Sequence, residues 1–325
     1  MKPIRVLLLA DTHLGFDYPF RPRVNKPRRG EDFFARYRDA LAPALRGEVD
    51  LVVHGGDVFF RSRIPEQLVW MGFQPLFEVA DAGVPVVVVP GNHERGHIPH
   101  GLLAMHRDVH IFHQPGTFEF ELHGLRVQIA GFPSERDDIR ARMPGLLEST
   151  GWRQREADIR LLCVHQAFEG ARVHGYTFRH RPDTARMADV PAAFDAVLCG
   201  HIHRHQVLTR DLQGRPAPAP VVYPGSVERT AFVERFEEKG YVLLELLPGQ
   251  VDWRFVRLSA RPMEVLEWRA APPEDLRARL AALPVDAVVQ VRVLGAWPAW
   301  LGAAWLRQNG GEGRVVSLSR LQLKQ

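Results

Sequence analysis

Five short apolar runs in this chain each end in residues that can bind a metal ion. Glycines at 55, 56, 91 and 200 lie at three of these endings, where a backbone without a Cβ can turn sharply. Each run reads as a strand, and in open α/β sheets sites form at the carboxyl ends of strands. The five endings are therefore expected to meet in one crevice. The metal-capable residues at the endings are Asp11, His13, Asp57, Asn92, His93, His165, His201 and His203.

The types of these side chains indicate a pair of divalent ions. Two carboxylates, one amide and several imidazoles mix oxygen and nitrogen donors, which suits Mn, Fe or Zn better than Mg or Ca. The set exceeds what one tetrahedral ion needs, so two ions that share a carboxylate are expected. Each motif alone has a structural alternative, because a strand that ends in Asp-x-His is common. All five motifs in this order favour the metal site.

The elements that must position these residues alternate along the first two thirds of the chain. Helical patterns at 32–45 and 65–82 separate the early strand-like runs, and Pro248-Gly249 reads as a hairpin turn between later ones. Alternation followed by hairpins predicts an α/β fold of mixed sheets with helices packed outside. The strand-like runs are 4–10, 49–54, 84–89, 117–122, 126–131, 159–165, 196–199, 221–223, 241–247 and 251–258.

The pattern resets near Ala260 and predicts a second, small domain with the order βαβαβ. Its last helix ends at Asn309-Gly310-Gly311, a common helix stop. The chain is therefore expected to divide into residues 1–258 and 259–325. The expected strands of the small domain are 262–268, 286–293 and 314–323, and its expected helices are 273–283 and 297–308.

The composition excludes several classes of protein. With 46% hydrophobic and 25% charged residues among 325, the chain is globular rather than disordered. No apolar run approaches the ~20 residues of a membrane span. The run before Asp11 is too short for a signal-peptide core. Cys163 and Cys199 lie in apolar runs, as small core residues of a reducing compartment do. We expect a cytoplasmic protein without membrane contact.

The ordered motifs resemble the pattern of the calcineurin-like metallophosphoesterases, and within that superfamily the chain is similar to the SbcD-type DNA double-strand-break repair nucleases. The resemblance covers residues 4–258 and is looser over 259–325, which stand in the place of the capping domain of that family. It implies a two-sheet β-sandwich flanked by helices. The narrower resemblance depends on Asp11-Thr12-His13-Leu14-Gly15, Gly56-Asp57-Val58-Phe59, and Tyr223-Pro224-Gly225-Ser226 with Glu234 and Lys239-Gly240.

The resemblance also implies roles for the site residues. His93 would stay off the metals, face the scissile phosphate and protonate the leaving oxygen; the alternative is that it only orients Asn92. Two divalent ions are implied, with Mn²⁺ expected first and Fe or Zn as alternatives. One ion would take Asp11, His13 and His203, the other Asn92, His165 and His201, with Asp57 bridging them.

Two basic segments suggest contacts with nucleic acid. Residues 21–29 carry five bases and no acid directly after the first metal motif, so they are either a solvated loop or a set of phosphate contacts. Residues 172–181 interleave bases with aromatics, which suits frayed or single-stranded nucleic acid but also the cover of a hydrophobic face. His205 is a candidate substrate contact or a solvated loop residue. The candidate phosphate contacts are Arg21, Arg23, Lys26, Arg28 and Arg29.

One residue departs from the family pattern. After Gly-Asp-Val-Phe the family commonly has His or Asp, and here Phe60 follows. A phenyl ring can stack on a base but cannot donate a hydrogen bond to phosphate. We therefore expect cleavage to survive while the balance between exonuclease and endonuclease changes; the alternative is that Phe60 packs under the cap.

The expected function is two-metal hydrolysis of DNA phosphodiester bonds in DNA repair, as exonuclease, endonuclease or both. The alternative is a phosphodiesterase or phosphatase acting on a small phosphoester, because the metal core alone does not separate them. A non-catalytic nucleic-acid-binding protein fits less well with a complete ligand set. The partners expected are DNA, a second copy in a homodimer, and an SMC-like coiled-coil ATPase. The helices on which the family docks that ATPase would follow the cap, and this chain ends at Gln325 after the last cap strand.

Overall fold

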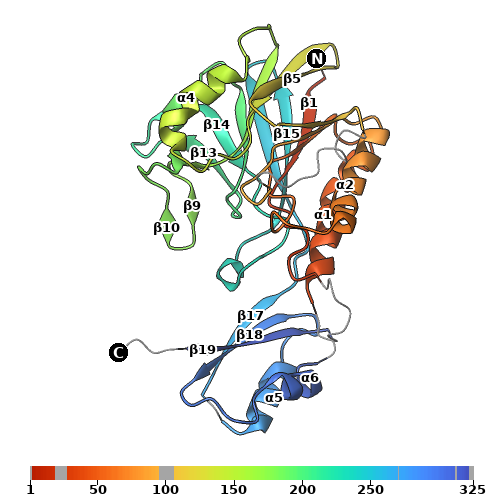
Figure 1. The fold of residues 1–325 in the computed structure, drawn as a ribbon, viewed down its shortest axis with the longest axis vertical. Coiled ribbons are helices and arrows are strands. Elements are labelled where there is room, and N and C mark those ends of the chain that lie inside the picture. The colour runs from red at the N-terminus through yellow and green to blue at the C-terminus, as the bar shows by residue number, and fades with distance from the viewer. Residues whose placement is uncertain (1, 19–27, 95–105, 270, 312, 322–325) are drawn as a thin grey trace.

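The computed structural model describes residues 2–18, 28–94, 106–269, 271–311 and 313–321. Two facing sheets with helices on their outer sides form the larger unit, and a smaller sheet with two helices lies beyond its lower end (Figure 1). The expected two-sheet β-sandwich flanked by helices is confirmed.

The first sheet has six strands in the order β16-β15-β1-β2-β3-β4. Strands β1 to β4 are parallel to one another, β15 is antiparallel to β1, and β16 is antiparallel to β15. Both faces of the sheet are buried: in β1, Leu7 and Leu9 face the helices, whereas Val6 and Leu8 face the second sheet. Burial on both faces explains why the strands read as continuous apolar runs. The bounds are β1 Ile4–Leu9, β2 Leu51–His54, β3 Val86–Val88, β4 Val109–Ile111, β15 Gly240–Leu247 and β16 Gln250–Arg257.

The second sheet has the order β13-β14-β12-β7-β6-β5. Its four inner strands are parallel, and β13 and β5 close its edges antiparallel. Its inner face joins that of the first sheet in one apolar layer that includes Ile129, Leu161 and Leu198. The bounds are β5 Gly116–Leu122, β6 Leu125–Gly131, β7 Ile159–His165, β12 Ala196–Gly200, β13 Gln206–Arg210 and β14 Pro216–Tyr223.

Helices complete a four-layer arrangement. The helices α1 (Gly30–Leu45) and α2 (Glu66–Asp81) cover the first sheet, close to the predicted ranges. The helix α4 (Ile139–Ser149) covers the second sheet and was not predicted, because only Ile139, Met143 and Leu147 form its apolar face. The short elements between β7 and β15 are β8 Ala167–Phe168, β9 Arg172–Val173, β10 Tyr176–Thr177, β11 Thr184–Ala185, and the 3₁₀ turns η1 Met187–Asp189 and η2 Phe232–Glu234.

The C-terminal unit is a parallel three-stranded sheet with β18 in the centre and two helices on one side (Figure 1). Its apolar cluster is built around Trp268. The last helix begins later than predicted, after Gly302. We propose that residues 259–325 form the capping domain and 1–258 the larger domain. The bounds are β17 Met263–Trp268, α5 Pro273–Ala281, β18 Val288–Leu294, α6 Ala303–Asn309 and β19 Val315–Leu321.

Within the described part of the chain, no helix combines the length and the apolar character that crossing a membrane requires.

Candidate metal centre

The loops that follow β1, β2, β3, β7 and β12 meet at one place between the two sheets. The amides of Asp11 and His13 donate to the carbonyls of Gly56 and Asp57, at 2.9 and 3.0 Å. The carbonyl of Gly55 lies so close to Gly200 that a Cβ at position 200 would overlap it. Glycine is therefore required where the two sheets approach, and it brings the metal-capable endings together as the sequence indicates.

Several of these residues adopt a backbone conformation that side chains other than glycine rarely take. The φ angles of Asp11, His13, Asp57 and His201 are 52°, 42°, 51° and 86°. Such conformations cost of the order of 1–3 kcal/mol each and persist where the surrounding structure enforces them, commonly at functional sites. The strain falls on residues that the sequence identifies as candidate ligands.

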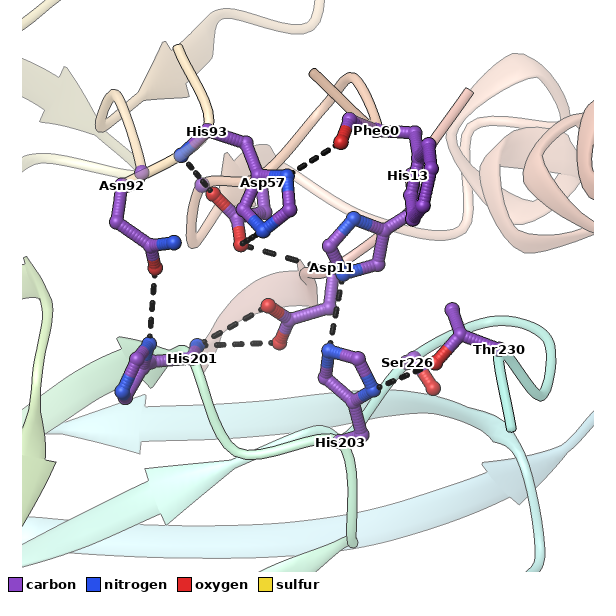
Figure 2. Close-up of polar contacts among 12 residues, drawn as sticks. Asp11, His13, Asp57, Phe60, Asn92, His93, His201, His203, Ser226 and Thr230 are labelled. Carbon is purple, nitrogen blue, oxygen red and sulfur yellow. Dashed lines mark hydrogen bonds and ion pairs between the residues drawn. The ribbon is translucent and has the colours of Figure 1, made fainter. Parts of the chain in front are cut away.

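One group of donor atoms comes from Asp11, His13 and His203 (Figure 2). Their ligand atoms all lie within 4.8 Å of one another. The Nε2 atoms of His13 and His203 face each other at 2.9 Å. The amide of His201 donates to both oxygens of the Asp11 carboxylate, at 3.2 and 3.1 Å, which fixes that carboxylate. The three side chains converge as ligands of one ion would.

A second group surrounds Asn92 (Figure 2). Its Oδ1 lies 3.1 Å from Nε2 of His165 and 3.0 Å from Nδ1 of His201. Asp57 lies between the two groups, because its Oδ2 is 3.4 Å from Nε2 of His165 and 3.9 Å from Nε2 of His13. The seven side chains thus form two clusters with Asp57 between them. The ligand atoms of His13, Asp57 and His93 also lie within 4.8 Å of one another, as do those of Asp11, Asp57 and His165.

The imidazoles of the centre are of two kinds. Burial, with the neighbouring His203, holds the pKa of His13 well below its usual range, and burial with the nearby His165 lowers the pKa of His201 to about 3. At His165 the Asp57 carboxylate outweighs burial and raises the pKa to about 9, and Glu234 and Asp11 likewise raise the pKa of His203. Neutral imidazoles keep a lone pair for a cation, so a metal ion would have to displace a proton from the second kind. The convergent oxygen and nitrogen donors therefore fit a pair of divalent ions.

His93 lies at the open side of the two clusters. Its side chain is 33% exposed, whereas those of His13 and His165 are 2% and 0% exposed. Its Nδ1 donates to the Phe60 carbonyl, and its amide donates to Oδ1 of Asp57 at 2.9 Å (Figure 2). With Nδ1 occupied, Nε2 faces Oδ2 of Asp57 at 3.8 Å. His93 thus lies beside the clusters and, with His13 and Asp57, also forms a group whose ligand atoms could hold an ion.

The Phe60 ring borders the same opening. Its centroid is 4.7 Å from that of Phe16 in an edge arrangement, and 5.9 Å from that of His93. The backbone of Phe60 therefore orients His93, while its ring forms an apolar wall beside it.

Two carboxyl groups to which the sequence assigned no role, those of Glu94 and Glu234, fix the loops that carry the candidate metal ligands. Glu94 is 2% exposed and accepts hydrogen bonds from the amides of Asp57, Phe59 and Gly91, at 3.0, 2.7 and 2.7 Å. It ties the loop after β2 to the loop after β3. Its place in the Gly-Asn-His-Glu motif was the only signal in the sequence.

On the other side, Glu234 supports His203. Its Oε1 lies 3.1 Å from Nδ1 of His203 and accepts from the Thr230 hydroxyl at 2.7 Å. The ammonium of Lys239, which is 1% exposed, pairs with Glu234 at 2.7 Å. These contacts direct Nε2 of His203 toward His13.

His54, at the end of β2, supports the loops as well. Its Nδ1 accepts from the Gly56 amide at 3.2 Å, and its Nε2 contacts the Thr12 hydroxyl at 3.1 Å.

The basic loop is described only in part. Arg21, Arg23 and Lys26 lie outside the described residues. Arg28 pairs with Asp17 at 3.0 Å. Arg29 is 3% exposed, lies 3.3 Å from the buried carboxylate of Glu228 and packs over the Phe33 ring. This placement differs from the expected phosphate contact, because a buried carboxylate needs a partner and Arg29 provides it.

His205 is a packed residue rather than a solvated one. Its Nδ1 donates to the Tyr223 carbonyl at 2.8 Å, and its ring stacks on Phe255 with centroids 4.2 Å apart.

Comparison with known proteins agrees with this geometry. The family model of the calcineurin-like phosphoesterases matches residues 4–205, so the chain belongs to that family of metal-dependent hydrolases. The chain is similar to proteins named DNA double-strand break repair protein Mre11. The one from Haloferax volcanii is 30% identical over 309 residues, which cover 90% of this chain and 61% of that protein. The one from Methanopyrus kandleri is 25% identical over 301 residues, covering 85% and 62%. The chain thus spans less than two thirds of either relative.

A further relative is named only as an uncharacterized member of the metallophosphoesterases. The uncharacterized metallophosphoesterase YhaO of Bacillus subtilis is 29% identical over 316 residues, which cover 90% of this chain and 72% of YhaO.

Proposed function

We propose that this protein is a two-metal nuclease that hydrolyses DNA phosphodiester bonds in DNA repair, as exonuclease, endonuclease or both. The observation that supports the proposal is the pair of clusters of candidate ligands with Asp57 between them and His93 at their open side. The similarity to relatives named as DNA repair proteins supports DNA as the substrate.

The proposed ligands divide as the family resemblance implies. One ion would be held by Asp11, His13 and His203, the other by Asn92, His165 and His201, and both would share Asp57; we propose Mn²⁺ for the two ions. Two such ions, when bound, neutralise charge on the phosphoryl oxygens and lower the pKa of a water.

A side chain of the protein, His93, is proposed to protonate the leaving oxygen. The Phe60 carbonyl accepts the Nδ1 proton of His93, so a second proton would be carried by Nε2, which lies 3.8 Å from Oδ2 of Asp57. We assign to His93 the donation of that proton to the leaving oxygen, a step worth typically ~10²–10⁴-fold in rate.

Substrate contacts, partners and location belong to the same proposal. Arg21, Arg23, Lys26 and Arg28 are proposed phosphate contacts. The family resemblance suggests a homodimer and an SMC-like coiled-coil ATPase partner. Sedimentation of the protein alone tests the first, and sedimentation with such an ATPase tests the second. Cytoplasmic location is proposed because the two cysteines are buried free thiols.

A comparison of substrates tests the function. Purified protein with Mn²⁺ is incubated with linear duplex DNA, single-stranded DNA and a small nitrophenyl phosphodiester. Cleavage of DNA that stops on chelation supports the proposal. Rapid hydrolysis of the small diester with no cleavage of either DNA favours the alternative, an enzyme for small phosphoesters.

A further inference from the structure

An exposed aromatic side chain lies close to the candidate metal centre. Phe236 is 82% exposed, more than any other large hydrophobic residue that the structure describes. It follows Glu234 by two residues, a span of at most ~7 Å, and Glu234 contacts His203 at 3.1 Å. The Arg235 guanidinium lies 4.3 Å from the centroid of the Phe236 ring. An aromatic ring with a cation beside it is therefore presented to solvent near the ligands.

The exposure of this ring does not come from a loose loop. The segment is held at one point by Glu234 on His203, and at another by Phe232, which packs against Met263 and Val288 of the small domain. Both the β9–β10 hairpin and the cyan loop that carries η2 project from the sandwich on the side where the small domain lies (Figure 1). Val233, which is 48% exposed, lines the same pocket as Phe236, so the two form an exposed apolar patch, which is a feature of ligand-binding surfaces.

Phe236 forms one wall of a pocket of about 390 Å³, within the size range of ligand sites. The ring pair of His205 and Phe255, stacked at 4.2 Å and 11°, lines another side. Arg204, which directly follows the ligand His203, and His174 in the turn of the β9–β10 hairpin complete the basic part of the lining. Segments far apart in the sequence thus bring aromatic and basic groups together.

Two arginines lie beside the aromatic rings of the pocket. Arg204 belongs to the lining, and Arg235 lies against the Phe236 ring. Of the two acidic residues of the lining, Glu237 shares Lys239 with Glu234, at 3.1 and 2.7 Å, and Glu238 pairs with Arg257 at 3.2 Å. The two arginines therefore place positive charge directly beside the rings. Aromatic faces combined with arginines are how proteins bind single-stranded nucleic acid, whose bases are free to stack, whereas the bases of a duplex are not.

We propose that this pocket binds an unpaired nucleobase of the DNA strand held at the metal centre, by stacking against Phe236 and the His205 side of the pocket. Arg204 and Arg235 lie where they can attract the neighbouring phosphates. This inference rests on the proposed nuclease function and narrows its substrate to strands that are single or frayed next to the scissile bond.

Binding of a short fluorescein-labelled single strand, followed by anisotropy, tests the pocket. All proteins carry His93→Ala so that the strand stays intact. Phe236→Ala should weaken binding by about ten- to a hundredfold, the range that stacking of one base gives on alanine substitution. Phe236→Trp should retain it. The matched control is Val285→Ala, since Val285 is 77% exposed but lies in the small domain outside the pocket lining; it should bind as the parent does.

A scan of abasic nucleotides along the strand locates the stacked base. In the parent protein, removal of the base at one position should weaken binding by the same factor as Phe236→Ala. In Phe236→Ala, removal of that base should cause no further loss, because the two changes delete one contact.

Two results separate the failure of this inference from the failure of the proposed function. The proposed base-binding pocket is refuted if Phe236→Ala binds the strand as tightly as Val285→Ala does, or if no abasic position weakens binding more than the others. Cleavage of DNA by the unmodified protein would still support the nuclease function in that case. If the unmodified protein hydrolyses a small nitrophenyl diester but neither binds nor cleaves DNA, the nuclease function itself is wrong.

Discussion

Glu94 offers a sharp test of how the ligand loops are held. Its carboxylate accepts three backbone amides from two loops: Oε2 accepts from Asp57 and Gly91, and Oε1 accepts from Phe59. A buried amide left without an acceptor costs about 1–3 kcal/mol. Glu94→Ala leaves three such amides and should lower the free energy of unfolding by about 3–9 kcal/mol, a large part of the ~5–15 kcal/mol that stabilises a domain.

Glu94→Gln should lower the free energy of unfolding by less than Glu94→Ala. A side-chain oxygen at the Oε2 position keeps two of the three hydrogen bonds and loses the one from Phe59, so this variant should lose about 1–3 kcal/mol. Because Asp57 and Asn92 lie on the loops that Glu94 joins, Mn²⁺ binding should weaken in the same order. Urea unfolding followed by circular dichroism gives the first quantity, and titration calorimetry the second.

A matched control completes this experiment. Glu156→Gln changes a carboxylate whose side chain is 88% exposed and should leave unfolding and metal binding unchanged. The reasoning is refuted if both Glu94 variants unfold at the same urea concentration as Glu156→Gln.

Three further predictions concern single residues. His93→Ala should keep two metal ions per chain and lose ~10²–10⁴-fold in cleavage rate; elemental analysis beside the rate checks this, and loss of an ion would make His93 a ligand. Phe60→His should change the ratio of cleavage of linear to circular single strands at constant metal content; equal slowing of both with lower thermal stability would mean that Phe60 only packs. Arg29→Ala should destabilise the fold by about 3–5 kcal/mol, because it removes the guanidinium 3.3 Å from the buried Glu228 carboxylate. A much smaller loss in urea unfolding would contradict the role of Arg29 as the cation that stabilises Glu228.

The sequence alone predicted the parts of the site that are local. A run of apolar residues followed by Asp57, or by His165, contains both the buried strand and the residue at its carboxyl end. The rule that such ends share one edge then places the endings together. The layers of the fold were predicted for the same reason, since each strand and the two early helices carry their own apolar pattern.

The parts that the sequence did not predict depend on partners distant in the chain. Glu94 acts through amides of the loop after β2, and Glu234 through a histidine on the loop after β12. Arg29 looked like a surface base because Glu228, which buries it, is far away in sequence. The helix α4 was missed because its apolar face is narrow: only Ile139, Met143 and Leu147 are buried among its 11 residues, whereas α2, which also contains a glycine and a proline, has a broad apolar face.

The most direct test of the central claim is the number of Mn²⁺ ions that the protein binds, measured by titration calorimetry on metal-free protein. Two ions per chain are expected for the unmodified protein. Asp57→Ala should lose tight binding of both, because Asp57 lies between the two clusters. A single ion in the unmodified protein, or two ions still bound tightly by Asp57→Ala, would contradict a two-metal centre bridged by this carboxylate.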